Sequence, residues 1–167
     1  MTSKFLTKQF YINLSVVFLI FIFDRLSKIY VLFKDEKSLE PNLFSSEFLN
    51  ISLIWNSGIA FGFFSFKEKY LYNIITIIIC LVIMVLIILV SKAEKFKKYS
   101  YLMVLGGALG NLYDRIVYMS VPDFIDIHFN GFHWFIFNIA DIFITLGVIC
   151  LIYDEIFIQK KTDVENI

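Results

Sequence analysis

The sequence predicts a membrane all-α bundle of four transmembrane helices, with a small β platform formed by the outer loops. Hydrophobic residues make up 59% of the chain and charged residues only 18%, and the mean hydropathy is +0.75. These values are too apolar for a soluble domain of 167 residues. Long apolar runs recur along the chain, so we expect residues 1–167 to form a single integral membrane domain.

The first predicted span covers residues 11–33, and charged side chains interrupt it toward its outer end. Asp24 and Lys28 are spaced i,i+4, so they can pair on one face of a helix. The basic start and apolar middle resemble a secretory signal peptide. However, no small-x-small cleavage pattern follows, and the apolar run continues beyond Lys28. We therefore expect a helix that stays in the membrane.

Three further spans are expected, at residues 70–90, 99–118 and 135–158. The first of these contains no charged residue. The second contains Gly106, Gly107 and Gly110, which allow a neighbouring backbone to approach closely. Because backbone groups in lipid must be hydrogen-bonded internally, a helix is the expected form of each apolar run.

The lysines predict the orientation of the bundle. The larger group, at one side, is Lys4, Lys8, Lys92, Lys95, Lys97, Lys98, Lys160 and Lys161. The smaller group, at the other side, is Lys34, Lys37, Lys67 and Lys69. Lysine is enriched in cytoplasmic loops, so we expect both termini in the cytoplasm and the loops 34–69 and 119–134 outside.

Both outer loops show the alternation that is typical of strands. Residues 49–55 alternate, Asn56-Ser57-Gly58 offers a turn, and residues 59–63 alternate again, which predicts a strand pair. In the second loop the alternation covers residues 125–130, and Asn130-Gly131 is a strong hairpin signal. We expect aromatic side chains of these loops at headgroup level, namely Phe63, Phe64, Phe66, Trp134 and Phe135.

Two Asn-x-x-Asp pairs mark the ends of the third and fourth predicted spans. Asn111 and Asp114 close the third span, and Asn138 and Asp141 open the fourth. Residues at this spacing share one face of a helix. Ionisable groups inside a bilayer are costly and usually face a protein interior or a wet cavity, so these pairs indicate a functional site.

Further carboxylates are expected at the same depth. Asp24 lies toward the outer end of the first span, and Asp123 lies in the second outer loop, where Asp126 is expected to be a solvated strand residue. An alternative interpretation is that these groups only join helices, with Asp114 and Arg115 neutralising each other.

The residues near the outer side favour carboxylate chemistry over other catalytic classes. Ser27 adjoins Lys28, but adjacent residues on a helix do not face each other, so a Ser-Lys dyad is not expected. The two cysteines fall inside apolar runs, which is typical of small buried hydrophobic residues. His128 and His133 lack a zinc-binding spacing and are expected at a strand surface, so we expect no metal and no other cofactor. The formal net charge of +0 offers no basic surface for nucleic acid.

Two carboxylates held close together in a partly desolvated site cannot both ionise easily, so they share one proton. The ionised member can take a proton from water while the protonated member donates to a carbonyl oxygen, as in an aspartic peptidase. The spacing leaves open which of Asp114, Asp123, Asp126 and Asp141 form such a pair.

Five motifs, in this order, resemble the bacterial lipoprotein signal peptidase family, also called type II signal peptidase. They are Asp24-Arg25-Leu26-Ser27-Lys28, Asn56-Ser57-Gly58-Ile59-Ala60-Phe61, the run GGALGNLYDR over residues 106–115, Val121-Pro122-Asp123-Phe124, and Phe137-Asn138-Ile139-Ala140-Asp141. Together they cover nearly the whole chain. Pro122 stands where a small aliphatic residue is expected; it restrains Val121 toward an extended conformation and removes no catalytic group.

The resemblance implies an intramembrane aspartic endopeptidase that removes the signal peptide from diacylglyceryl-modified bacterial prolipoproteins and cuts before the lipidated cysteine. Asp123 and Asp141 match the catalytic pair of the family. Supporting or substrate-binding positions are matched by Asp24, Lys28, Asn56, Gly58, Gly110, Asn111, Asp114, Arg115, Asn138 and Ala140.

The resemblance also implies a location. We expect a multi-pass protein of the bacterial cytoplasmic (inner) membrane, with the β platform and the active site near the periplasmic face. The expected partners are the lipidated prolipoprotein and membrane lipid, and a monomer is favoured.

Functions of two other classes remain as alternatives. A small proton-relay or transporter subunit would also place Asp, Arg and Lys residues in the membrane, although the predicted span at residues 70–90 has no charged residue to continue a relay. A structural or assembly protein would explain Gly106 and Gly110 but not the paired Asn-x-x-Asp pattern.

Overall fold

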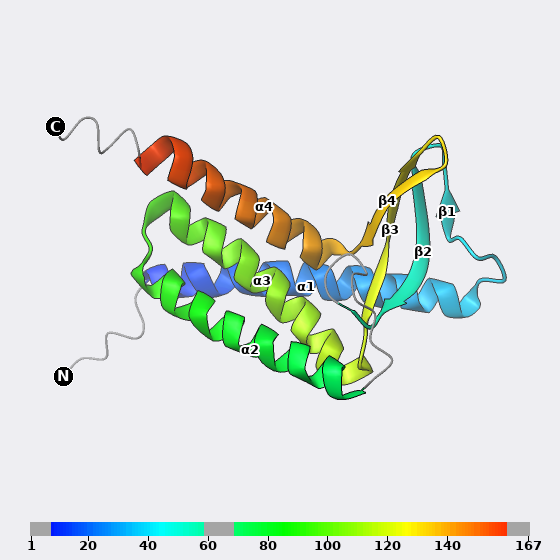
Figure 1. The fold of residues 1–167 in the computed structure, drawn as a ribbon, viewed down its shortest axis with the longest axis horizontal. Coiled ribbons are helices and arrows are strands. Elements are labelled where there is room, and N and C mark those ends of the chain that lie inside the picture. The colour runs from blue at the N-terminus through cyan, green and yellow to red at the C-terminus, as the bar shows by residue number, and fades with distance from the viewer. Residues whose placement is uncertain (1–7, 59–68, 160–167) are drawn as a thin grey trace.

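The computed structural model describes residues 8–58 and 69–159, and in these ranges the chain forms four α-helices with a four-stranded sheet at one end (Figure 1). The helices are α1 (Lys8–Lys37), α2 (Lys69–Lys92), α3 (Lys95–Tyr118) and α4 (Ile139–Tyr153), which continues into the π-helical segment η2 (Asp154–Gln159). The strands are β1 (Phe44–Ser45), β2 (Leu49–Asn56), β3 (Val121–Phe129) and β4 (Phe132–Phe137). The start of α1 and the end of α4 both lie at the end of the bundle away from the sheet.

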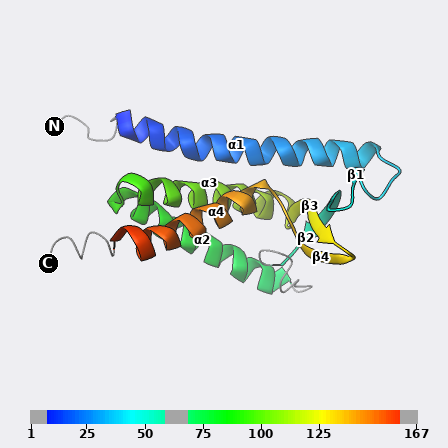
Figure 2. The same ribbon diagram turned by 90° about the horizontal axis from the view of Figure 1, so that it is seen from above.

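Helix α3 is the centre of the bundle. It packs against α4, α1 and α2, and Figure 2 shows α1 along one side of it. Between α2 and α3, Ile83, Leu86 and Leu105 form a buried hydrophobic cluster. The carboxyl end of α3 leads through Met119, in the left-handed conformation, into β3. The sheet is thereby attached directly to the central helix.

Each of the four predicted apolar runs contains a helix, but the predicted bounds need correction. Helix α1 extends beyond residues 11–33 at both ends and has 30 residues, or about 45 Å of length. Helix α4 begins at Ile139 instead of residue 135, because the residues before it pair in β4.

Among the described residues, one helical stretch, Tyr72–Lys92, is by itself long and apolar enough to cross a membrane, with a mean hydropathy of 3.5. Helices α1 and α3 carry buried charged side chains, and the regular part of α4 has only 15 residues. Four transmembrane spans therefore remain a prediction.

The sheet is antiparallel, with the strand order β1-β2-β3-β4. The predicted hairpin is confirmed: Asn130 and Gly131 have φ angles of 48° and 78°, as the tight turn between β3 and β4 requires. The expected partner of β2, residues 59–63, lies outside the described residues, as do Phe63, Phe64 and Phe66. Within the described part of the chain, β2 pairs with β1 and β3.

A buried ionic cluster joins α1 to α3. Its members, Asp24, Arg25, Lys28 and Asp114, are between 0% and 8% exposed. Lys28 Nζ lies 2.9 Å from Asp24 Oδ1 and 2.6 Å from Asp114 Oδ2, so the predicted Asp24–Lys28 pair is confirmed. The guanidinium of Arg25 contacts both carboxylates. The alternative in which Asp114 is neutralised by Arg115 is wrong, because the ion-pair partners of Asp114 come from α1.

Glycines allow the helices to approach this cluster. A Cβ atom on Gly110 would lie 2.6 Å from Asp24 Oδ2, and one on Gly107 would lie 2.5 Å from the backbone oxygen of Ala140 in α4. The small-residue packing predicted for this helix is therefore confirmed at both positions.

We predict that Gly107→Ala lowers the free energy of unfolding by about 1–3 kcal/mol, because the added methyl group meets a backbone carbonyl that cannot turn away. Denaturant unfolding in detergent micelles measures the change. The control is Ile116→Ala on the same helix, where the side chain is 64% exposed and a change within about 0.5 kcal/mol is expected. Equal changes in the two variants would contradict the close approach of α3 and α4.

We also predict that Asp114→Asn destabilises the protein by about 3–5 kcal/mol, because it leaves Arg25 and Lys28 buried with Asp24 as their remaining carboxylate in the cluster. The matched control is Glu155→Gln, which removes a contact of 3.1 Å to Lys97 at a side chain that is 64% exposed. That change is expected below about 1 kcal/mol. Thermal unfolding measures the loss of stability in both variants. A loss in Asp114→Asn no larger than that in Glu155→Gln would contradict a structural role for the cluster.

Candidate active site

Asp123 lies on β3 with two side-chain amides directed at it. Its Oδ1 accepts from Asn138 Nδ2 at 2.6 Å, and its Oδ2 accepts from Asn56 Nδ2 at 2.8 Å. Asn56 ends β2, where the chain pairs with the first residue of β3, and Asn138 follows β4. The sheet therefore brings both amides to the carboxylate, which is 2% exposed.

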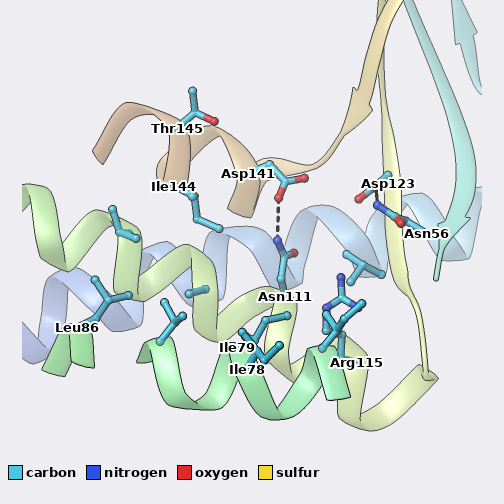
Figure 3. A pocket seen from close by; sticks show the side chains of 15 residues that line it. Asn56, Ile78, Ile79, Leu86, Asn111, Arg115, Asp123, Asp141, Ile144 and Thr145 are labelled. Carbon is cyan, nitrogen blue, oxygen red and sulfur yellow. Dashed lines mark hydrogen bonds between the residues drawn. The ribbon is translucent and has the colours of Figure 1, made fainter. Parts of the chain in front are cut away.

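Asp141 lies in the first turn of α4, where it forms a capping box with Asn138. Asn138 Oδ1 accepts from the backbone N–H of Asp141 at 3.1 Å, and Asp141 Oδ2 accepts from the backbone N–H of Asn138 at 3.2 Å. Figure 3 shows the remaining bond, from Asn111 Nδ2 to Asp141 Oδ1, at 2.7 Å. Asn138 therefore connects the two carboxylates, since its amide group bonds Asp123 and its backbone bonds Asp141.

Asn111 links this pair to the buried ionic cluster. Lys28 Nζ donates to Asn111 Oδ1 at 3.0 Å, on the side of the amide away from Asp141. A second link runs from the backbone N–H of Ala140 to Asp24 Oδ1, at 3.1 Å. The start of α4 is thus fixed to α1 as well as to α3.

Both carboxylates line a cavity of about 330 Å³ together with Asn56, Asn111 and Arg115 (Figure 3). The rest of its wall is mainly apolar side chains of α2, α3 and α4. Asp141 also borders a second cavity of about 400 Å³, lined by apolar side chains of β3, β4 and α4 that include Trp134 and Phe137. The carboxylate pair therefore has polar neighbours on one side and apolar space on two others.

Burial, and after it the neighbouring carboxylate of Asp141, raise the pKa of Asp123 to about 7, although the amides of Asn56 and Asn138 oppose the shift. Near neutral pH this carboxyl group therefore holds a proton about half of the time. A carboxyl group that exchanges a proton near pH 7, beside a second carboxylate, is suited to general acid-base chemistry.

Arg115 positions the end of the first outer loop. Its guanidinium donates to the backbone oxygen of Gly58, and the hydroxyl group of Tyr72 donates to the backbone oxygen of Arg115 at 3.1 Å. The backbone N–H of Gly58 in turn donates to Asn56 Oδ1 at 2.8 Å. Arg115 and Gly58 therefore act on Asp123 through Asn56.

The structure brings together the predicted site residues, which are Asp24, Lys28, Asn56, Gly58, Gly110, Asn111, Asp114, Arg115, Asp123, Asn138, Ala140 and Asp141. Of the four carboxylates left open as a pair, Asp123 and Asp141 share the cavity. Asp114 is enclosed in the ionic cluster.

Asp126 is not the solvated residue that was predicted. It is 5% exposed, on the face of β3 opposite to Asp123, and its Oδ2 lies 2.8 Å from His133 Nδ1 and 3.3 Å from Asn50 Nδ2. These neighbours from β2 and β4 cover it. The side chain of His133 is 54% exposed, so its predicted surface position is confirmed.

Two supporting residues were missed by the sequence analysis. Arg25 could have been found, because it stands three positions before Lys28 on the same face of α1. Tyr72 gives no such signal, since it is one aromatic residue at the start of an apolar run. In the described ranges, no group of three His, Cys, Asp or Glu residues has the geometry of a metal site.

Comparison with known proteins gives consistent matches over most of the chain. A family model described as signal peptidase (SPase) II matches residues 16–157. A lipoprotein signal peptidase of Pelagibacter ubique is 50% identical over 165 residues, which cover 98% of this chain and 99% of that protein. One of Burkholderia multivorans is 38% identical over 150 residues and 86% of each chain.

Two solved structures described as bacterial membrane enzymes have the same fold. One has a TM-score of 0.69 at 33% identity and covers 92% of this chain and 90% of its own. The other has a TM-score of 0.69 at 31% identity, with 87% and 92% covered. The motifs, the fold and these matches agree, and the chain belongs to the signal peptidase II family.

Proposed function

We propose that this protein is an intramembrane aspartic endopeptidase that removes the signal peptide from diacylglyceryl-modified prolipoproteins and cuts before the lipidated cysteine. The observation that carries the proposal is the pair Asp123 and Asp141, which lie in one cavity with amide donors on each carboxylate. The relatives named lipoprotein signal peptidase support the choice of substrate.

In the proposed mechanism a water molecule lies between the two carboxyl groups. The ionised member takes a proton from the water, whose oxygen attacks the carbonyl carbon of the scissile peptide bond, and the protonated member donates its proton to the carbonyl oxygen. Collapse of the tetrahedral intermediate with proton transfer to the leaving nitrogen releases the signal peptide. The Asn side chains hold both carboxyl groups in place, so little reorganisation is needed.

The surroundings of the pair suit a lipid-modified peptide. Two largely apolar cavities meet at Asp141, so apolar chains of a substrate can stay out of water while the amide bond reaches the carboxyl groups. We propose four transmembrane helices in the bacterial inner membrane, with the sheet on the periplasmic side. The lysines at the bundle end away from the sheet support this orientation, because they are in the larger group.

No feature of the described residues favours a proton relay over the peptidase. Apart from the lysines that begin α1 and α3, the charged groups of these two helices lie toward the sheet, and α2 has no charged residue between Lys69 and Lys92. A relay across the bilayer would need ionisable or hydrated positions along its full depth.

We predict that Asp123→Asn and Asp141→Asn each abolish cleavage of a diacylglyceryl-modified prolipoprotein while the fold is kept, because each variant removes a proton donor or acceptor from the pair. A gel-shift assay with the purified protein in lipid measures cleavage, and thermal unfolding measures folding. The same assay includes two controls. The wild-type protein should leave the unmodified prolipoprotein uncut, and a chelator should not change its cleavage of the lipidated form.

Normal cleavage by either variant would show that Asp123 and Asp141 are not the catalytic pair. If the wild-type protein leaves both substrates uncut, the peptidase function itself fails, and proton flux into vesicles becomes the test of the relay alternative.

The raised pKa of Asp123 predicts a pH-dependent stability that is independent of activity. Because the folded protein holds this proton up to about pH 7 whereas the unfolded chain releases it near 3.8, burial of Asp123 lowers the stability as the pH rises from about 4 to 7. In Asp123→Asn this loss is absent. The difference in free energy of unfolding between variant and wild type should therefore shift in favour of the variant across that window, by up to about 4 kcal/mol.

Unfolding curves at several pH values between 4 and 8 measure this difference. Any constant cost of placing an amide at position 123 cancels when the pH values are compared. A difference that does not change with pH would contradict the raised pKa of Asp123.

A further inference from the structure

We infer that Asp141 is the ionised member of the pair and takes the proton from water, and that Asp123 is the acid. Lys28 is then a positioning residue that acts on Asp141 through Asn111. This inference rests on the proposed peptidase function. It is carried by the direction of the hydrogen bonds and by the different elements that hold the two carboxyl groups.

The amide of Asn111 has one possible orientation. Lys28 Nζ can only donate hydrogen bonds, and it lies 3.0 Å from Asn111 Oδ1. The NH₂ group must then face Asp141 Oδ1, 2.7 Å away. Lys28 is itself held by Asp24 and Asp114, with its side chain 1% exposed, so the amide cannot turn without breaking a buried charge-assisted bond.

Asp141 has a second group that favours its charged form. It lies at the third position of α4, where its Oδ2 accepts the backbone N–H of Asn138. The amino end of a helix carries a partial positive charge, which stabilises a carboxylate in the first turn. An ammonium group acting through one amide and a helix end therefore both act in favour of an ionised Asp141.

Asp123 has neither of these groups next to it in the hydrogen-bond network. It lies on a strand, and the oxygen atoms of its amide donors Asn56 and Asn138 accept from the backbone N–H groups of Gly58 and Asp141. These are uncharged donors, in contrast to Lys28. With one proton for the two carboxyl groups, that proton is held at Asp123.

The other charged groups near the pair are the four members of the ionic cluster, which balance one another, and Arg115, which donates to the backbone oxygen of Gly58. From α1 and α3 they are Asp24, Arg25, Lys28, Asp114 and Arg115. Asp24 and Asp114 are paired with Arg25 and Lys28, so in this cluster two negative charges face two positive charges. The cluster therefore acts on Asp141 through the hydrogen bond that Asn111 donates.

The test compares two matched Asn→Leu substitutions, because Asn111 bonds Asp141 and Asn56 bonds Asp123. The pH dependence of kcat/KM for cleavage of the lipidated prolipoprotein reports the base in its acidic limb and the acid in its alkaline limb. Asn111→Leu removes a donor from the ionised base, so its acidic limb should move up by about one pH unit while the alkaline limb stays. Asn56→Leu should move the alkaline limb up by about one pH unit instead.

The reverse pattern, or equal movement of both limbs in both variants, would overturn the assignment while leaving the peptidase function intact. If the wild-type protein does not cleave the lipidated substrate, the proposed function has failed instead. Should a Leu variant not fold, as thermal unfolding would reveal, the Asn111→Ala and Asn56→Ala pair gives the same comparison with a smaller side chain.

The role of Lys28 is tested in Asp24→Asn/Lys28→Met, which removes the ammonium group without changing the net charge of the cluster. It should move the acidic limb in the same direction as Asn111→Leu. Adding Asn111→Leu to this variant should move it no further, because both changes interrupt one connection. Additive shifts would overturn the action of Lys28 through Asn111.

Discussion

The ion pairs of Lys28, whose ammonium group is buried between the carboxylates of Asp24 and Asp114, hold the helices and the candidate site in place. A buried charge without partners would cost several kcal/mol, so the middle of α1 and the carboxyl end of α3 must stay together. Asp24 then accepts the backbone N–H of Ala140, which fixes the start of α4. The cluster therefore places three helices relative to one another at the depth where the reactive groups lie.

The second level of organisation is a set of three asparagine amides. The oxygen atom of each is occupied by a donor: Lys28 for Asn111, and backbone N–H groups for Asn56 and Asn138. Each amide must then direct its NH₂ group at a carboxyl group of the pair. This arrangement explains why asparagine stands at these positions, since aspartate could not donate and an aliphatic side chain would leave the neighbouring donors unpaired. It also keeps the carboxyl groups in place before any substrate arrives.

The two sets of buried carboxylates in this protein have different roles because they have different partners. Asp24 and Asp114 face cations and stabilise the bundle, whereas Asp123 and Asp141 face neutral amides, a helix end and each other. Only the second set borders the cavities where a substrate could lie. The protein thus separates the charge that holds helices together from the charge available for reaction, with Asn111 as the connection between them.

The helices, the hairpin at Asn130-Gly131 and the gathering of carboxylates could be predicted from the sequence, because apolar periodicity, turn residues and the cost of charge in an apolar run act locally. The strand period of β3 also places Asp123 and Asp126 on opposite faces, because successive side chains of a strand alternate. Three other features follow from tertiary contacts: Asp114 pairs with α1 instead of Arg115, residues 135–137 belong to β4 instead of the last helix, and Asp126 is covered by neighbours on β2 and β4. These outcomes depend on which distant side chains satisfy a buried charge or an unpaired strand edge, and such partners are chosen by packing in three dimensions and not by spacing along the chain.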